Sequence, residues 1–316
     1  MPTTTTQNST YAGEAAAKYV SAALLSSVTL ENGGVDVIPN IKFRRTLRPA
    51  NIGDIIKDAT CDFNATGNVE LLERKLEPKE LQVNEELCKD TFQKDWDAIS
   101  MGFSAHDVIP KNFNDFIIAE NSAQVAESNE INIWRGNSAN SGEYDGFTTL
   151  IKSDPDLPAA QEITGTTVTA ANVITELGKV ADAVPARLYG REDLNIYVSQ
   201  NIFRAYKRAL GGFAAQGKGA AGVGNNGPNQ DINVLFFDGI KVFMANGLAQ
   251  NTMIATRKSN LKFGTGLLND HSEVKVLDMA DTDGSQNVRF VMRFTAGVQY
   301  EFAKDFVTYG ISNTVN

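Results

Sequence analysis

The chain is poor in the residues that build disulfide frameworks, metal centres and nucleophilic active sites. It has two cysteines, Cys61 and Cys88, and two histidines, His106 and His271, among 316 residues. Two cysteines do not supply a disulfide framework, and the histidines lie at no recognised zinc-ligand spacing. We therefore expect a reducing environment, no metal site and a fold that depends on apolar burial. The 42% of apolar residues can build such a core in one large or two medium domains.

Positive charge and long hydrophobic runs are also scarce. The formal net charge is −9, which argues against a protein whose main task is to grip nucleic acid through its phosphates. The apolar run from Ala15 to Leu25 is interrupted by Lys18 and is far shorter than the roughly 20 residues of a membrane-spanning helix. Met1 to Tyr11 has no positive side chain, so neither a signal peptide nor a membrane anchor is expected.

The charged and nucleophilic side chains form no catalytic pattern. The acidic pairs Glu85-Glu86 and Glu77 with Glu80 lie in a polar segment where nothing would shift their pKa values, so solvated charge is expected. The chain has no G-x-S-x-G elbow, and neither histidine has a nucleophilic Ser or Cys in a recognised context. We predict no enzymatic activity, no catalytic or metal-binding residue and no cofactor.

The segment from Gly211 to Pro228 matches the G-x-G-x-x-G pattern of nucleotide sites twice. The matching glycines are Gly217, Gly219 and Gly222, and then Gly222, Gly224 and Gly227. That pattern holds a pyrophosphate when a strand precedes it and a helix N-terminus follows it. Here a predicted helix precedes the loop and a predicted hairpin follows it. We therefore interpret the segment as a mobile surface loop that binds no nucleotide.

Strand patterns dominate the stretch from Asp231 to Tyr300. Asn233–Phe237 and Ile240–Met244 are separated by Asp238-Gly239, a pair that accepts positive φ at both positions of a tight hairpin turn. Glu273–Met279 and Asn287–Ala296 form a second pair of predicted strands. In the last of these, one face is apolar and the other polar. The apolar face comprises Val288, Phe290, Met292 and Phe294, and the polar face comprises Arg289, Arg293 and Thr295.

Apolar residues at helical spacing predict four helices. These are Glu14–Ser27, which Gly33-Gly34 would end, Asn112–Ser128, Ala170–Val184, which Thr169 would cap, and Gln200–Leu210, which Ser199 would cap. The expected buried faces are Phe113, Phe116, Ile117, Glu120, Ala123 and Gln124 in the second helix, Val173, Ile174, Leu177, Val180, Ala181 and Val184 in the third, and Ile202, Phe203, Tyr206 and Leu210 in the fourth. Glu130–Arg135 and Leu194–Val198 are predicted to be strands, and Gly136–Asp145 a polar loop.

Two interpretations are open for the segment from Val35 to Leu87, where extended pieces alternate with charge. It forms either a small peripheral subdomain with a twisted sheet or a long two-stranded arm whose apolar face needs a neighbour to cover it. Its apolar residues are too dispersed to build a compact core: Leu71, Leu72, Leu76, Leu81, Val83 and Leu87.

Charges of opposite sign lie on the two limbs of this proposed arm. The basic residues Lys42, Arg44, Arg45 and Arg48 are interleaved with Phe43 and Leu47. Such an alternation of basic and apolar side chains suits phosphate or RNA. A protein partner is favoured, because acidic residues on the returning limb can pair with these basic residues within the arm or across subunits. The acidic residues are Glu70, Glu73, Glu77 and Glu80. Trp96 and Trp134 are expected to be core or interface anchors.

The order of two amphipathic helices, a glycine-rich loop and paired strands resembles the C-terminal half of a tailed-bacteriophage major capsid protein of the Hong Kong 97 fold. The resemblance is carried by Ala170–Val184, Leu194–Val198, Gln200–Leu210, Gly211–Pro228 and the strands from Asp231 to Tyr300. It implies an α+β fold with an N-terminal arm, an extended loop, a peripheral domain and an axial domain. The implied boundaries are 1–34 for the N-terminal arm, 35–90 for the extended loop, 91–149 for the peripheral domain with its spine helix, 150–258 for the axial domain, and 259–316 for the returning strands of the peripheral domain.

The resemblance implies a viral structural protein of the virion capsid, assembled in the bacterial host cytoplasm. Copies would form hexamers and pentamers that close into an icosahedral shell around double-stranded DNA, without sequence-specific binding and without a membrane. The implied partners are further copies, a separate scaffolding protein, a portal and decoration or cement proteins. The rival interpretations are an encapsulin-type bacterial compartment shell, a surface binding protein and a carboxylate-using enzyme.

Overall fold

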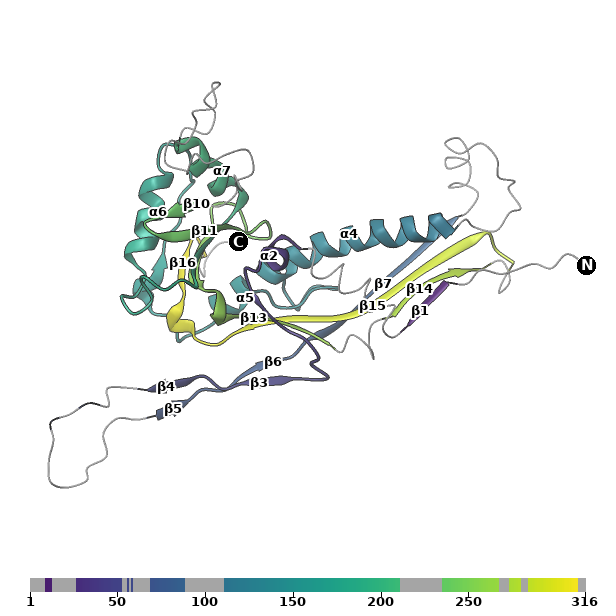
Figure 1. Ribbon diagram of the computed structural model, residues 1–316, viewed down its shortest axis with the longest axis horizontal. Helices are drawn as coiled ribbons and strands as arrows, with labels where there is room; N and C mark the ends of the chain where they lie inside the picture. Colours follow the sequence, from purple (N-terminus) through teal and green to yellow (C-terminus); the bar gives the residue numbers. More distant parts are fainter. Residues whose placement is uncertain are drawn as a thin grey trace, which may run out of the picture.

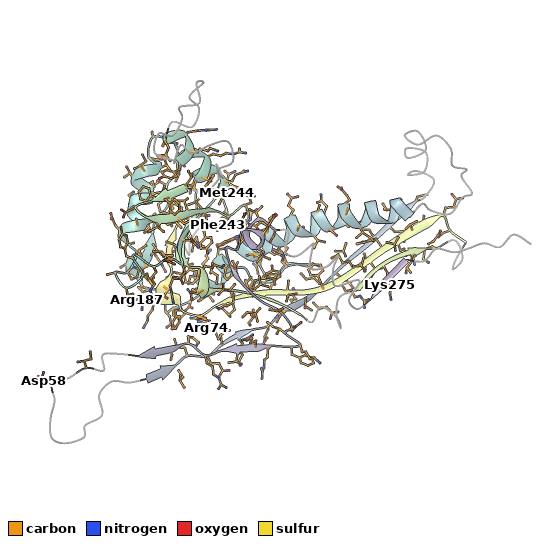
Figure 2. The ribbon with its side chains drawn as sticks, viewed as in Figure 1. Asp58, Arg74, Arg187, Phe243, Met244 and Lys275 are labelled. Carbon is orange, nitrogen blue, oxygen red and sulfur yellow. The ribbon has the colours of Figure 1, made fainter. Side chains whose placement is uncertain are left out.

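The computed structural model describes residues 9–12, 27–52, 56, 58, 69–88, 111–210, 235–266, 273–279 and 284–311. These residues form an elongated sheet overlain by a long helix, a more compact unit at one end of that sheet, and a narrow arm that projects from below the body (Figure 1). Figure 2 labels Arg74 and Arg187 where the arm lies beneath the body, and Asp58 toward the far end of the arm.

The elongated sheet is organised around strand β15 (Asn287–Tyr300). Strand β7 (Lys79–Cys88) pairs with it along one edge, and β14 (Glu273–Asp278) and β13 (Leu261–Thr265) follow one another along the other edge. All three pairings are antiparallel. The six-stranded sheet is completed by β1 (Ser9–Ala12) beside β14 and β2 (Asp36–Ile38) beside β13.

Side chains along β15 alternate between a buried face and a wet face, which confirms the sequence prediction. The buried side chains are Val288, Phe290, Met292 and Phe294, each at most 5% exposed. Arg289 and Arg293 on the other face are exposed. The predicted partner strand is also confirmed, because Val276 lies opposite Phe290 and Val274 opposite Met292 in the ladder with β14. Period-2 patterning therefore sets both the face and the register of this pair.

Helix α4 (Lys111–Arg135) lies along the elongated sheet and is longer than predicted. The predicted strand Glu130–Arg135 is wrong, because these residues form the last turns of α4. The apolar pair Ile133 and Trp134 is fully buried there. A polar loop from Gly136 to Asp145 follows, as predicted, and leads into the short helix α5 (Phe147–Lys152).

The buried face of α4 differs from the predicted one over the part whose side chains are described. Glu120, Ala123 and Gln124 were expected to be buried but are exposed. The residues that pack inward are Ile118, Asn121, Val125, Ala126, Asn129, Glu130, Asn132, Ile133 and Trp134. Four of these nine side chains are polar, so apolar spacing alone points to the wrong side of the helix.

The compact unit contains the second six-stranded sheet, in the order β10-β11-β9-β12-β16-β8. Its strands are β8 (Glu162–Ile163), β9 (Leu194–Val198), β10 (Leu235–Phe237), β11 (Ile240–Met244), β12 (Met253–Arg257) and β16 (Val307–Tyr309). The predicted hairpin is confirmed, because β10 and β11 pair antiparallel and Asp238 and Gly239 have φ values of 49° and 77°. Three short 3₁₀ turns connect elements: η1 (Ala159–Gln161), η2 (Lys258–Asn260) and η3 (Ala303–Asp305).

Helix α6 (Val173–Asp182) confirms the third predicted helix with two differences. It begins after Asn172, so the predicted cap Thr169 lies one turn too early. The predicted stripe is buried except at Ile174, which is 51% exposed. The buried members are Val173, Leu177, Val180, Ala181 and Val184.

Helix α7 (Gln200–Ala209) begins after Ser199 as predicted, although the Ser199 hydroxyl donates to the Asn201 side chain at 2.7 Å instead of capping a backbone N–H. Its predicted apolar face is confirmed at Ile202, Phe203 and Tyr206, which are all buried. The helix therefore contributes one wall of the core of the compact unit.

Strand β9 confirms the predicted strand Leu194–Val198, lies between two cores and is buried along its whole length. Ile196 and Val198 pack into the core beneath α6 and α7. Tyr197 points into the core of the elongated sheet, with its ring 5.1 Å from that of Trp134 and 5.3 Å from that of Phe243. The pattern of an internal strand is apolar on both faces.

The segment projects from the body as a two-stranded arm, which is shorter than predicted. It consists of two antiparallel ladders, β3 (Arg45–Leu47) with β6 (Arg74–Leu76) and β4 (Ala50–Ile52) with β5 (Val69–Leu71). The residues from Lys79 onward, which were expected on the returning limb, belong to the body as β7. Leu81 of β7 is buried, and Val83 and Leu87 pack against the same core at period-2 spacing.

Several predictions fall outside the described residues. These are the helix Glu14–Ser27 apart from Ser27, the loop Gly211–Pro228, and the residues Cys61, Trp96, His106 and His271. Among the described residues, no helix is long and apolar enough to cross a membrane. Searched over the same residues, no group of three or more His, Cys, Asp and Glu side chains is placed to hold a metal ion.

A buried carboxylate joins three parts of the body. Glu130 of α4 accepts hydrogen bonds from the backbone N–H of Thr29 at 2.9 Å, from the Thr29 hydroxyl at 2.5 Å and from the backbone N–H of Gly247 at 3.4 Å. Thr29 lies in the short helix α2 (Val28–Glu31), and its hydroxyl also accepts from Trp134 Nε1 at 2.8 Å. The carboxylate thus links the N-terminal segment, the long helix and the turn after β11.

We predict opposite effects for two glycine-to-alanine changes. A Cβ at Gly247 would lie 2.0 Å from the backbone oxygen of Glu130, so Gly247→Ala must displace backbone and should lower the free energy of unfolding by about 1–3 kcal/mol. A Cβ at Gly178 within α6 would meet nothing within 4 Å, so Gly178→Ala should raise it by about 0.5–1 kcal/mol. Urea unfolding of both variants checks this. Equal effects would contradict the close approach of α4 to the turn.

Candidate functional site at the root of the arm

The arm exposes apolar side chains that no other described residue covers. Phe43 is 84% exposed, Leu71 is 71% exposed, and Ile56, beyond the second ladder, is 93% exposed. An isolated two-stranded ribbon is marginally stable in water, and exposed apolar residues on it cost further free energy of hydration. The arm therefore has an exposed apolar surface of the kind that is typical of interaction sites.

The root of the arm is anchored in the body by two leucines. Leu47 and Leu76 are 8% and 0% exposed. In the register of the first ladder, Arg45 lies opposite Leu76 and Leu47 opposite Arg74. Leu76 packs over Gly264 of β13, whose missing side chain leaves the space that the leucine occupies. The arm is thus fixed at one end, while Leu71 and Ile56, farther out, are exposed.

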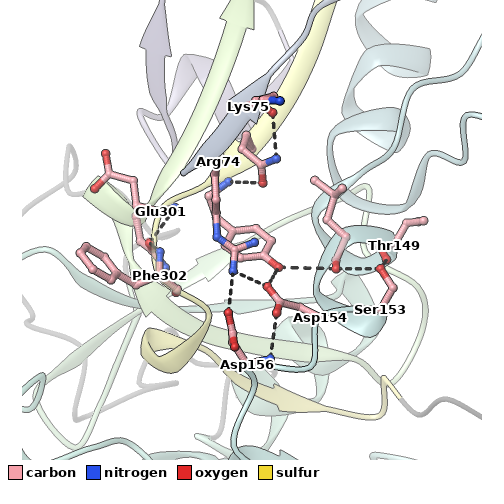
Figure 3. A network of polar contacts seen from close by, with 12 residues as sticks. Arg74, Lys75, Thr149, Ser153, Asp154, Asp156, Glu301 and Phe302 are labelled. Carbon is pink, nitrogen blue, oxygen red and sulfur yellow. Dashed lines mark hydrogen bonds and ion pairs between the residues drawn. The ribbon is translucent and has the colours of Figure 1, made fainter. Parts of the chain in front are cut away.

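Arg74 of β6 is the polar anchor at this root (Figure 3). Its guanidinium donates to Asp154 Oδ2 at 2.5 Å and lies 3.6 Å from Asp156 Oδ2. It also stacks over the ring of Tyr300, 4.5 Å from the ring centroid, and the Tyr300 hydroxyl donates to the same Asp154 carboxylate. Strand β15 ends at Tyr300, and the two aspartates follow α5. One arginine therefore connects the arm with two separate elements of the body.

The electrostatics of Asp154 follow from this geometry. Burial alone would raise the pKa of its carboxyl group, but hydrogen bonds from Tyr300, from the backbone N–H of Asp156 and from Arg74 together lower that pKa below its ordinary value of 3.8. Burial and the hydrogen bond to Asp154 raise the pKa of Tyr300. The carboxylate is therefore ionised and the phenol protonated across the neutral pH range, which is the pairing that holds Arg74.

The charges singled out in the sequence lie in different places from this anchor. Glu85 and Glu86 of β7 are exposed, as predicted, and Glu86 pairs with Arg289 at 3.1 Å. The strand register places Arg45 opposite an apolar residue and not opposite one of the predicted acidic partners. Trp134 is fully buried, which confirms its prediction as a core anchor, and Cys88 is free and exposed.

Sequence reasoning missed Arg74, Asp154 and Tyr300. The one local signal was the Asp154-Pro155-Asp156 turn, in which Asp154 Oδ1 accepts from the Asp156 N–H at 2.9 Å. The three residues come together only because β6, the end of β15 and the turn after α5 meet in space. No local pattern in the sequence brings them together.

The arrangement of sheet, spanning helix, compact unit and projecting arm defines a class of folds found among solved structures. No family model and no curated protein matches the sequence. A chain of the native GTA particle capsid is similar over 91% of this chain and 89% of that chain, with a TM-score of 0.57 and 12% identity. A chain from the procapsid of satellite phage P4 is similar over 92% and 97%, with a TM-score of 0.53 and 11% identity.

A chain from the capsid of cyanophage P-SCSP1u is similar over 87% of this chain and 86% of that chain, with a TM-score of 0.53 and 11% identity. The likeness extends over nearly the whole length of each chain. The protein therefore has the fold of phage capsid proteins, and the predicted mixed helix-and-sheet capsid fold is confirmed. At such low identity, the likeness shows the fold alone.

We predict that Asp154→Asn destabilises the free subunit in a pH-dependent manner. Because the pKa of Asp154 in the folded state lies below its ordinary value of 3.8, its stabilisation is present above that pH and is lost as the pH falls through the folded-state pKa. The variant should therefore lose about 1–3 kcal/mol at pH 7, and less at pH 3.

The matched control is Asp156→Asn, because Asp156 is 54% exposed and lies farther from Arg74. It should change the free energy of unfolding by less than about 1 kcal/mol at either pH. Urea unfolding at pH 7 and pH 3 measures both variants. A loss for Asp154→Asn that is the same at both pH values would contradict the ionised anchor.

Proposed function

We propose that the protein is a structural capsid subunit that assembles with copies of itself into the shell of a tailed bacteriophage. The observation that carries the proposal is the arm, which exposes apolar side chains on a chain whose fold matches capsid proteins over 91% to 92% of its length. A subunit that works alone gains nothing from such a surface, whereas a subunit in a shell can lay it against a neighbour.

The finer organisation of the proposed shell follows the expectations from the sequence. Copies form hexamers and pentamers of an icosahedral shell around double-stranded DNA, assembled in the host cytoplasm with a scaffolding protein, a portal and decoration or cement proteins. The net charge of −9 supports a container that encloses DNA without gripping each phosphate. No constellation of the described side chains favours a reaction, so we propose a structural role.

We also propose the domain division with one change. Residues 1–34 form the N-terminal arm, 91–149 and 259–316 the peripheral domain, and 150–258 the axial domain. The extended loop, expected over 35–90, becomes shorter: it excludes β2 at its start and β7 at its end, because both strands pair with strands of the elongated sheet.

Expression in bacteria, alone and beside the scaffolding and portal proteins encoded with it, tests the function. Electron microscopy and sedimentation should show closed shells. Copurified double-stranded DNA supports the phage shell, and a copurified cargo enzyme would replace it with a bacterial compartment. A protein that stays monomeric under both conditions would rule the proposal out.

We predict that two leucines of the arm separate assembly from folding. Leu71→Ala should leave the free energy of unfolding of the subunit within about 0.5 kcal/mol, because the side chain is exposed. It should raise the subunit concentration needed for shells by about tenfold, because a covered leucine contributes about 1.5–3 kcal/mol per interface. Leu76→Ala is the matched control, since it truncates a fully buried side chain and should cost the subunit about 2–5 kcal/mol.

We further predict that assembly protects the arm from hydrogen exchange. In the free subunit, backbone amides of β4 and β5 should exchange fast, because three residue pairs form their ladder. In shells the same amides should exchange more slowly, while amides of β15 should be slow in both states. Equally strong protection of β4 and β5 in the subunit and in the shell would show that the arm needs no neighbour.

A further inference from the structure

A pocket of about 300 Å³ lies between the root of the arm and the compact unit. The arm contributes Ala50, Leu72 and Arg74, and the loop after α6 contributes Arg187 and Arg191. The opposite wall is formed by Arg257 and by the η3 turn with its flanking residue Phe302. Its lining therefore comes from three parts of the chain, and the shape of the pocket depends on their relative positions.

The pocket concentrates positive charge in a chain that is acidic overall. Five cationic side chains line it against two carboxylates: Arg74, Arg187, Arg191, Arg257 and Lys304 against Asp156 and Asp305. Arg187 and Arg257 both pair with Asp305, at 2.6 Å and 2.5 Å. The chain as a whole carries −9. Arg74 is also paired with Asp154, which lies outside the lining, so five cations face three carboxylates and two positive charges remain in excess, which favours an anion.

The unpaired cations are Arg191 and Lys304. Both are exposed, and neither makes an ion pair with any described residue. Their surroundings are held in place, because Arg187 donates to the backbone oxygen of Lys304 at 2.8 Å and Arg191 Nε donates to the backbone oxygen of Arg187 at 3.2 Å. Guanidinium groups fixed in this manner present several N–H donors, which suits the oxygens of a carboxylate or phosphate.

We propose that this pocket binds an oxyanion with more than one negative charge or a pair of carboxylates, and that the bound anion fixes the arm against the compact unit. This inference goes beyond the assembly of a shell, since binding belongs to the single subunit. Two sources can supply the chemistry: a free phosphate-type anion, or acidic side chains of a second copy of this chain. Leu72 and Arg74 line the pocket, so an occupied pocket restrains the arm at its root.

Calorimetric titration of the free subunit with pyrophosphate tests the proposal. The wild-type protein should bind saturably. The double variant Arg191→Gln/Lys304→Gln should bind about tenfold more weakly or not at all, since it removes the two unpaired cations. The control Arg204→Gln/Lys207→Gln removes the same charge from α7, outside the pocket, and should bind as the wild type does. Circular dichroism checks that each variant is folded.

A second readout follows the arm itself. Pyrophosphate should slow hydrogen exchange at residues 69–76 in the wild type and in the α7 control, and not in the pocket variant. No saturable binding by the wild type at millimolar pyrophosphate, or equal weakening in both double variants, would overturn the proposal.

The same titration on assembled particles distinguishes the two sources of the anion. This experiment alone rests on the proposed function, because it needs shells. Pyrophosphate that binds subunits but not particles identifies acidic side chains of a second copy as the occupant in the shell. Pyrophosphate that binds both identifies a free anion. Both outcomes support an oxyanion site, whereas absence of shells would leave the result on the free subunit unchanged.

Discussion

The structure depends on the pairing of one strand, β15, along both of its edges. Its 14 residues carry β7, from far earlier in the sequence, on one side and the neighbouring strands β14 and β13 in succession on the other, so all three take their register from it. Its buried face supplies much of the core beneath α4. The strand ends at Tyr300, whose hydroxyl and ring hold Asp154 and Arg74. One strand therefore organises both the sheet of the body and the anchor of the arm.

The arm differs from the body because few contacts within the chain stabilise its described residues. Its ladders have three residue pairs each, and Leu71 and Ile56, beyond the root, are exposed. Among the described residues, Leu47, Leu76, the Arg74 network and the hydrogen bond from Gln299 Nε2 to the backbone oxygen of Lys75 connect it to the body. The root fixes the direction of such a ribbon, but the local free energy of unfolding farther out is small. A segment with these properties becomes stably ordered when another molecule covers it. The arm is therefore a better guide to function than the larger core.

Local patterns in the sequence predicted the elements whose buried faces are apolar. The turn at Asp238-Gly239, the alternation along β15 and the apolar face of α7 were all recognisable, because backbone conformation or side-chain period depends on adjacent residues. Helix α4 was misjudged, because Asn121, Asn129, Glu130 and Asn132 face inward. These polar groups are compatible with burial only through partners such as Thr29, Tyr144 and Gly142, which the sequence does not place beside them.

The root of the arm could not be predicted for a related reason. Arg74 is one of many charged residues between Val69 and Cys88, and nothing adjacent distinguishes it from those that remain solvated. Its role arises because the register of β6 with β3 places it over the end of β15, beside the turn after α5. Arg74 is also one of the residues that line the pocket beside the compact unit. Because the same side chain pairs with the carboxylate that holds the arm, the proposed anion would act on the position of the arm through it.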